Sequence, residues 1–317
     1  RFAVLVLVPV LGAAIAWQYI GESRAKFEFR IEDSRYPGAQ ALAMGEPLYD
    51  PDNDVVPPFA AVSSDWTTWR PGECVRIETE DDSNARECRM SPPEGVEPQR
   101  RVAVAGDSHT WQLASALIPI AREENWELTS FYRPGCPLTA TTDPELVKKE
   151  CAQWNREVLP KIIDLNPDVL ITMGTRNVRV GLTERTPDGY VEQWRRLAEH
   201  GIRVLAVRDN PRFDYQPPEC VQLHGLDAPE CGRPRSELYH VQPPWETAGN
   251  VPANTAFVDL SDYFCTPAVC PPVIGNVLVY VDDNHVTQTY MKTLAPILKV
   301  KMLDALGWEP LSAAAPK

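Results

Sequence analysis

The sequence predicts an α/β fold in which helices flank a parallel sheet, and three observations lead to this prediction. From residue 100 onward, short apolar runs alternate with amphipathic stretches, which is the pattern of βαβ units. Chain breakers such as Asn166-Pro167 and Gly201 stand between these segments. The 31 prolines among 317 residues, about twice the usual share, exclude an all-helical bundle.

The apolar runs are the predicted strands, and the amphipathic stretches between them are the predicted helices. Strands are expected at residues 102–106, 128–132, 168–173, 202–207, 256–260 and 277–281. Helices are expected at residues 111–126, 154–165, 190–200 and 286–306, the last interrupted by Pro296. A long proline-rich insertion occupies residues 209–250.

The chain before this core is predicted to hold a membrane anchor and an extension. Residues 2–20 carry no charge and, as a helix about 29 Å long, match the thickness of a bilayer. A signal peptide is the alternative, since Ala14-Ile15-Ala16 resembles a cleavage site. The start at Arg1 instead of Met favours a piece cut from a longer polypeptide. The expected units are a transmembrane helix at 1–21, a linker and extension at 22–99, the main domain at 100–308 and a flexible tail at 309–317.

The charge balance excludes one class of partner. Lys and Arg total 31 against 44 Asp and Glu, so the formal net charge is −13. A chain with this charge repels polyanions, and we therefore expect no nucleic acid as a partner. The hydrophobic residues, 44% of the chain, are enough to bury a core, which excludes disorder throughout.

Eight cysteines after the apolar segment indicate an oxidising compartment. They form neighbouring pairs along the chain, and an even number behind an export-type segment favours disulfides. The cysteines are Cys74, Cys88, Cys136, Cys151, Cys220, Cys231, Cys265 and Cys270. Their connectivity stays open at this point. A zinc site in the insertion, where two of these cysteines accompany His224 and His240, is disfavoured because no tight C-x2-C or H-x3-H pair occurs there.

The first candidate for chemistry is the run Ala105-Gly106-Asp107-Ser108-His109, where the first predicted strand ends. Ligands of open α/β sheets bind at the carboxyl ends of strands, and a Ser at a helix N-terminus presents its N–H to a bound anion. The position therefore suits a nucleophile. A Ser that only caps the helix is the structural alternative.

The second candidate is the pair Asp282 and His285, just after the last predicted strand. A serine hydroxyl becomes a good nucleophile when an imidazole accepts its proton, and the imidazole needs a carboxylate to fix its tautomer. Either motif alone is weak, but together they predict a triad of Ser108, His285 and Asp282. The neighbouring Asp283 is the alternative carboxylate.

These motifs resemble those of the SGNH (GDSL-type) esterases and acyltransferases. The resemblance implies a flavodoxin-like parallel sheet flanked by helices, the SGNH hydrolase-like fold. It implies an oxyanion hole made of the N–H groups of Ser108 and Gly135 and the side chain of Asn177. The last lies in Gly174-Thr175-Arg176-Asn177, which has one residue more than the family's G-x-N.

A closer resemblance, over residues 74–306, is to the SGNH domains fused to acyltransferase family 3 membrane proteins. It rests on GDSH with His109, on Gly-Cys-Pro at 135–137 followed by Cys151, and on Cys265 and Cys270 before Asp-x-x-His. In that family a membrane bundle moves an acyl group, commonly acetyl, outward, and the SGNH domain is thought to transfer it to an envelope glycan or glycolipid. The resemblance implies that a membrane acyltransferase domain of the same polypeptide delivers the group, ultimately from acetyl-CoA. It implies no cofactor and no metal in this domain.

The function expected from the resemblance is O-acyl transfer through an acyl-serine, by a domain anchored in the cell membrane and facing the periplasm or cell surface. Two alternatives remain. If water replaces the sugar hydroxyl, the same triad makes a carbohydrate esterase or deacetylase. A non-catalytic glycan-binding domain is the other, and the intact triad residues argue against it.

The remaining candidates are assigned supporting roles. Asp107 is expected to support the turn by accepting backbone N–H bonds, and His109 to form the pocket wall or a hydrogen bond beside the nucleophile. Arg133 and Arg176 flank the proposed oxyanion loops, where they could attract an anionic acceptor. Trp245, in the insertion, is the candidate for stacking on a sugar ring, whereas the helical Trp residues are expected in the core, namely Trp111, Trp154 and Trp194.

Overall fold

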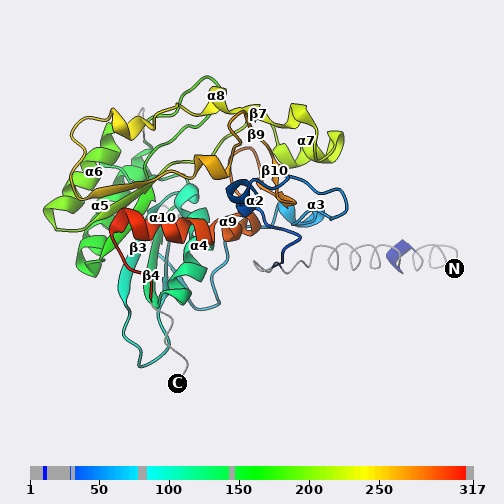
Figure 1. The fold of residues 1–317 in the computed structure, drawn as a ribbon. Helices are drawn as coiled ribbons and strands as arrows, with labels where there is room; N and C mark the ends of the chain where they lie inside the picture. The colour runs from blue at the N-terminus through cyan, green and yellow to red at the C-terminus, as the bar shows by residue number, and fades with distance from the viewer. Residues whose placement is uncertain (1–9, 13–28, 30–32, 78–83, 143–146, 312–317) are drawn as a thin grey trace, which may run out of the picture.

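A seven-stranded sheet forms the centre of the protein (Figure 1). The computed structural model describes residues 10–12, 29, 33–77, 84–142 and 147–311. The strand order is β1-β2-β4-β3-β5-β6-β8. The strands are β1 (Cys74–Arg76), β2 (Arg86–Met90), β3 (Arg100–Gly106), β4 (Trp126–Tyr132), β5 (Val169–Met173), β6 (Val204–Val207) and β8 (Thr255–Val258).

The strands from β4 to β8 in this order are parallel to one another. Numbered among themselves in chain order they lie as 2-1-3-4-5, the flavodoxin-like arrangement. The chain moves from β3 to β4 on one side and then crosses to β5 on the other. In such sheets this reversal leaves a crevice outside the carboxyl ends of the two strands, where ligands bind. The predicted parallel sheet is confirmed, and Ser108 follows the strand at its reversal point.

Helices cover both faces of the sheet. The helices α4 (Ser108–Glu123), α9 (Gln288–Thr293) and α10 (Ala295–Leu306) pack together, in front of the sheet in Figure 1. The helices α5 (Lys149–Leu165) and α6 (Asp188–Glu199) belong to right-handed crossovers that carry them to the other face. Because both faces are covered, every residue of β5 and β6 is buried, which explains their uninterrupted apolar sequences.

Of the two elements predicted last along the chain, the strand was wrong and the helix was confirmed. The expected strand at 277–281 is only β11 (Val277–Leu278), which pairs with β10 (Val273–Ile274) in a separate hairpin. Gly275 and Asn276 between them have φ of +55° and +57°, so a tight turn closes the hairpin. The interruption expected in the helix at 286–306 is confirmed: α9 ends at Thr293, and Pro296 lies in the first turn of α10, where a proline removes no helical hydrogen bond.

The described part of the extension packs on the main domain. It contains α2 (Ala39–Met44), α3 (Phe59–Val62) and the β1–β2 hairpin, of which β2 pairs antiparallel with β4. The Gly38 N–H donates to the Gly275 carbonyl at 3.2 Å. The buried hydroxyls of Thr67 and Ser115 lie 2.7 Å apart. The sheet therefore takes in two strands that precede residue 100 and that the sequence analysis did not predict.

The predicted transmembrane helix at 1–21 falls almost entirely outside the described residues, as does most of the predicted tail at 309–317. Among the residues that the structure describes, no helix has the length and apolarity needed to cross a bilayer.

Four disulfides join the cysteines as neighbouring pairs, which confirms the predicted bridges. They are Cys74–Cys88, Cys136–Cys151, Cys220–Cys231 and Cys265–Cys270. The third bridge ties α7 (Pro217–His224) to the segment before β7 (Arg233–Pro234) and α8 (Arg235–Leu238), and the last lies at β9 (Val269–Cys270). Because Cys220 and Cys231 are bonded to each other, neither is available as a zinc ligand.

Candidate active site

Ser108 is the first residue of α4, two residues after the end of β3. Gly106 has φ of +149°, and a Cβ there would lie 2.8 Å from the Thr110 hydroxyl, so the turn requires glycine. Asp107 caps the helix, because its Oδ1 accepts the His109 N–H at 3.0 Å. The interpretation of Ser108 as the cap is therefore wrong, and its hydroxyl is free to meet another partner.

That partner is His285. Its Nε2 lies 2.8 Å from the Ser108 Oγ, and its Nδ1 lies 2.8 Å from the Asp282 Oδ2. A carboxylate only accepts hydrogen bonds, so Nδ1 carries the proton and Nε2 is left to accept the serine hydroxyl. Ser108, His285 and Asp282 thus form one continuous chain of hydrogen bonds, although Ser108 and His285 are 177 positions apart in the sequence.

The turn that follows Val281 fixes the carboxylate. Asp282 Oδ1 accepts the backbone N–H groups of Asn284 at 2.9 Å and of His285 at 2.7 Å. Burial raises the pKa of Asp282, but the hydrogen bonds from the His285 ring and from these two N–H groups outweigh it and bring the pKa below its ordinary value. Asp283 instead accepts from the Asn284 side chain at 2.9 Å, so the alternative orienting carboxylate is not the one at the ring.

A cavity of about 460 Å³ opens over the serine hydroxyl. Its walls come from the segments after β3, β4, β5 and β6, from Asn284 and His285, and from Trp66 of the extension. Gly135, in the loop after β4, has φ of +67° and lines the cavity with Ser108. Neither N–H group donates to another described residue, so both are available to an oxyanion. Asn177 is not among the described residues that line the cavity, whereas Thr175 and Arg176 are.

The comparisons with known proteins agree with this geometry. The family model for the SGNH domain that is fused to AT3 domains matches residues 73–299. The chain belongs to this family. A comparison with curated proteins finds no match.

Two solved structures are similar to this SGNH domain at low identity. One is the periplasmic domain of a lipopolysaccharide acetyltransferase from Salmonella ser. Paratyphi A, with 14% identity and a TM-score of 0.48, over 64% of this chain and 83% of that one. The other is the esterase domain of a Rhodothermus marinus protein, with 11% identity and a TM-score of 0.30, over 74% of this chain and 99% of that one.

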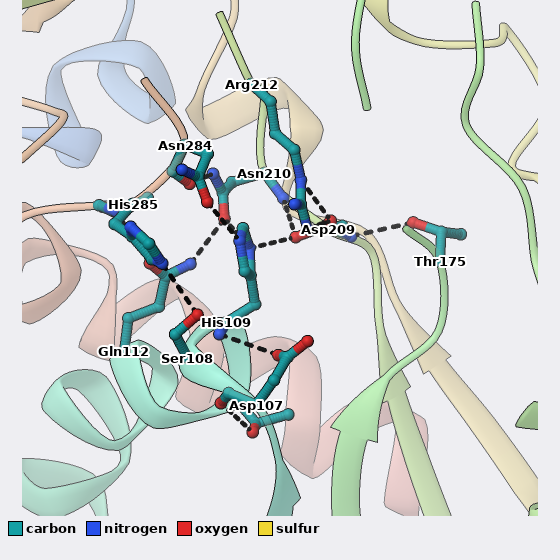
Figure 2. A network of polar contacts seen from close by, with 12 residues as sticks. Asp107, Ser108, His109, Gln112, Thr175, Asp209, Asn210, Arg212, Asn284 and His285 are labelled. Carbon is teal, nitrogen blue, oxygen red and sulfur yellow. Dashed lines mark hydrogen bonds and ion pairs between the residues drawn. The ribbon is translucent and has the colours of Figure 1, made fainter. Parts of the chain in front are cut away.

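The sequence analysis of this SGNH domain missed the polar residues that follow β6. Asp209, Asn210 and Arg212 lie beside His109, and two of them line the cavity (Figure 2). They stand at the carboxyl end of a predicted parallel strand, so the rule that singled out Ser108 also applied to them. Trp66, whose ring centroid lies 4.8 Å from that of His285, had no comparable signal because it comes from the extension.

The tryptophan and arginine predictions had mixed outcomes. Trp245 is only 8% exposed and stacks on Phe257 at 4.8 Å, so the prediction that it contacts a sugar ring was wrong. The predicted core residues Trp111, Trp154 and Trp194 are buried as expected. Arg133 is 4% exposed and is not among the described cavity residues, whereas Arg176 lines the cavity and has no hydrogen-bond or ion-pair partner for its guanidinium among the described residues.

Proposed function

We propose that this SGNH domain is a serine-dependent O-acyltransferase that moves an acyl group, most simply acetyl, to a hydroxyl of an extracytoplasmic glycan or glycolipid. The observation that carries the proposal is the hydrogen-bonded chain from Asp282 through His285 to Ser108, which ends at the floor of an open cavity. A Ser–His–Asp chain with a neighbouring oxyanion hole is the machinery of acyl transfer.

In the first step His285 takes the proton of Ser108 as Oγ attacks the acyl carbonyl. The negative charge that develops on the carbonyl oxygen is stabilised by the N–H groups of Ser108 and Gly135. Collapse of the intermediate expels the donor's leaving group, which takes the proton from His285, and leaves an acyl-serine. Asp282 holds the imidazole in the tautomer that both proton transfers require.

In the second step a sugar hydroxyl enters the cavity and gives its proton to His285 as it attacks the acyl-serine. The Ser108 oxygen leaves and recovers a proton from His285, so the enzyme returns to its starting state. Asn177, whose side chain was the third predicted oxyanion donor, is not among the described residues that line the cavity. The mechanism therefore uses the two backbone N–H groups alone.

The family is described as an SGNH domain fused to AT3 domains, and we infer that such a membrane acyltransferase domain delivers the acyl group, ultimately from acetyl-CoA. The domain itself would then need no cofactor. Four disulfides support an oxidising, extracytoplasmic location. A helix at 1–21 would anchor the domain at the membrane, close to the source of its donor.

A carbohydrate esterase is the second candidate. The His285 side chain is 17% exposed and faces the open cavity, so water has access to an acyl-serine. Transfer and hydrolysis use the same first step, and they differ only in which hydroxyl attacks.

The test is Ser108→Ala in the complete polypeptide, expressed in cells whose own gene has been removed. We expect the acetyl content of the envelope glycan to fall to the level of the deletion strain, and labelling by a serine-directed fluorophosphonate to vanish. Ser236→Ala is the matched control, since Ser236 is exposed on α8. Unchanged acetylation in the Ser108→Ala cells would contradict the proposal, and acetate release without transfer to glycan would favour the esterase.

A further inference from the structure

His109 is a buried titratable side chain that the triad does not use. It follows Ser108 on α4, its side chain is only 3% exposed, and its ring centroid lies 5.3 Å from that of His285. The inference drawn from it rests on the proposed role of Ser108 and His285, but its central claim is a protonation state, which can be measured without any activity.

Both nitrogens of the His109 ring face oxygen atoms (Figure 2). Nδ1 lies 2.7 Å from the Asp209 Oδ1 and 3.0 Å from the Asn210 Oδ1. Nε2 lies 3.1 Å from the Asn284 Oδ1. The carboxylate is an acceptor in any orientation, so only the two amides need to be examined.

The orientation of the Asn210 amide is fixed by its other contacts. Its Nδ2 donates to the carbonyl oxygens of Pro211 and Asn284, both at 2.9 Å. Its Oδ1 accepts from the Gln112 Nε2, and the Gln112 Oε1 in turn accepts the Val286 N–H at 2.8 Å. Turning the amide over would leave two carbonyl oxygens facing an oxygen and the Gln112 donor facing an NH₂.

The Asn284 amide is fixed in the same way. Its Nδ2 lies 2.9 Å from the Asp283 Oδ1 and 3.4 Å from the Asp282 Oδ1. Since a carboxylate oxygen only accepts, the NH₂ group must face the two aspartates and the amide oxygen must face His109. Each ring nitrogen of His109 therefore meets acceptors only, and an unprotonated nitrogen would place a lone pair against an oxygen.

A positive charge on the buried His109 ring has a counter-ion, the carboxylate of Asp209. Asp209 is fully enclosed, its second oxygen accepts from the Arg212 Nη2 at 2.7 Å, and its backbone N–H donates to the Thr175 hydroxyl oxygen at 3.0 Å. A buried cation is tolerated when it is paired and hydrogen-bonded in this way.

The other charged groups near the ring come from three elements. Burial lowers the pKa of His109 and the Arg212 charge lowers it further, but Asp209 raises it more strongly, Asp107 on its own helix adds to this, and the net shift is upward. Burial raises the pKa of Asp209, and Arg212 and His109 together bring it well below its ordinary value. The loop before α9 carries Asp282 and Asp283, the latter 3.9 Å from the Arg179 guanidinium, and it places the His285 ring 5.3 Å from that of His109.

We propose that His109 is a permanently protonated positioning residue, whose imidazolium joins Asp209 to Asn284 and thereby fixes the loop that carries Asp282 and His285. Asn284 is held at three points, since His109 binds its side-chain oxygen, Asn210 binds its carbonyl and Asp282 accepts its N–H. His285 is the next residue, and in the proposed mechanism its ring is protonated and deprotonated twice in each catalytic cycle.

The protonated state has a chemical consequence for the nucleophile. His109 is its immediate neighbour, but an imidazolium has no lone pair and cannot accept the Ser108 proton. That proton goes to His285 alone. A His109 without the proton on Nε2 would leave the Asn284 amide oxygen without its donor.

The direct test is NMR of the full chain in detergent micelles, labelled with ¹⁵N-histidine. The chain has five histidines, and the His109→Gln variant assigns the signals of this ring by their loss. We expect both His109 nitrogens to carry a proton from about pH 5 to about pH 8, a range in which an ordinary imidazole loses one. A ring nitrogen without a proton at neutral pH would overturn the proposal.

The positioning role is tested with Asp209→Asn, which removes the counter-ion and keeps the shape. We expect the ring to lose one proton in the neutral range, and kcat for p-nitrophenyl acetate to fall about tenfold to a hundredfold with KM little changed, because a displaced loop misplaces the base. Glu184→Gln is the matched control. It removes a buried carboxylate that binds Arg208, the residue before Asp209, and it should leave kcat unchanged. An Asp209→Asn enzyme with unchanged kcat would refute the positioning role.

The catalytic role of Ser108 and the charge of His109 can be tested separately. If Ser108→Ala retains activity, the proposed function is wrong while the protonation state of His109 stands as measured. If Ser108→Ala is inactive and His109 is neutral, the proposed function stands and this inference is wrong.

Discussion

Two histidines lie side by side in this domain, each bound to an aspartate, and they are built for different work. His285 contacts Asp282 on one side and the Ser108 hydroxyl on the other, at the wall of an open cavity. His109 contacts Asp209 on one side and the Asn284 amide oxygen on the other; it borders the same cavity, but its side chain is only 3% exposed. The aspartates do not distinguish the two rings.

The difference lies in the partner of the second nitrogen. A hydroxyl donates as well as accepts, so the His285 Nε2 is left with the lone pair that a general base requires. An amide oxygen only accepts, so the His109 Nε2 keeps its proton and the ring is a fixed cation. The partner of the ring nitrogen that faces away from the aspartate therefore distinguishes a histidine that can act as a base from one that is a fixed cation. Each of the following predictions tests part of this comparison.

The largest expected effect separates the two rings directly. His285→Ala removes the base, and we expect kcat/KM for p-nitrophenyl acetate to fall by about 10⁴-fold or more. His109→Gln should cost about a hundredfold at most, since it only displaces the base. Steady-state kinetics of both variants provides the comparison, and equal losses would mean that His109 takes part in the chemistry.

The second effect concerns the two aspartates of the turn. Asp282→Asn leaves the shape intact but removes the acceptor that fixes the His285 tautomer, and we expect kcat to fall by about 10³-fold to 10⁴-fold. Asp283→Asn is the isosteric comparison and should lose far less, because Asp283 does not contact the ring. Fluorophosphonate labelling rates would measure both, and a reversed order would identify Asp283 as the orienting carboxylate.

The third effect concerns a buried charge without a catalytic neighbour. Arg208 forms ion pairs with Glu184 and Asp259. The Arg208 side chain is 2% exposed and that of Glu184 is 0% exposed. Glu184→Gln leaves Arg208 partly uncompensated, and we expect the free energy of unfolding to fall by about 3 kcal/mol. Urea unfolding measures this loss. A stable variant would indicate that Asp259 and the His240 carbonyl are sufficient partners for the guanidinium.

The smallest effect is a dependence of stability on pH. Because the folded state raises the pKa of His109, its contribution to stability is fully present below about pH 6.5, where the unfolded chain also holds the proton, and is lost as the pH rises through the folded-state value. We expect the free energy of unfolding to decline as the pH rises above about 6.5, and to decline less in His109→Gln. Parallel curves for the two proteins would show that His109 does not supply the slope.

The parts of the site that could be predicted from the sequence are those carried by local patterns. Ser108 follows an apolar strand and a glycine turn, and the Asp-x-x-His spacing places a carboxylate and an imidazole in one turn. The core strands were found within a few residues because their apolar runs reflect burial on both faces.

The rest depends on which segments meet in space. Asp209 carries no local mark that pairs it with His109, because the two residues come from different strand ends and are joined only by the order of the sheet. Trp66 lies in the extension, where the sequence has no periodic apolar pattern from which its packing against His285 could be predicted. The apolar run at 277–281 predicted a strand of the main sheet. It contributes instead to the β10–β11 hairpin, because two residues with positive φ, Gly275 and Asn276, turn the chain just before it.

The β1–β2 hairpin has a consequence for solubility. A parallel sheet that ended at β4 would expose a row of unpaired N–H and C=O groups, which invites pairing with another chain. Here β2 pairs with β4, and the outermost strand, β1, is three residues long, is bound to β2 by the Cys74–Cys88 disulfide and ends in Arg76. The sheet thus ends in a short strand that is covalently tied to its neighbour, and loss of this bridge should appear first as aggregation.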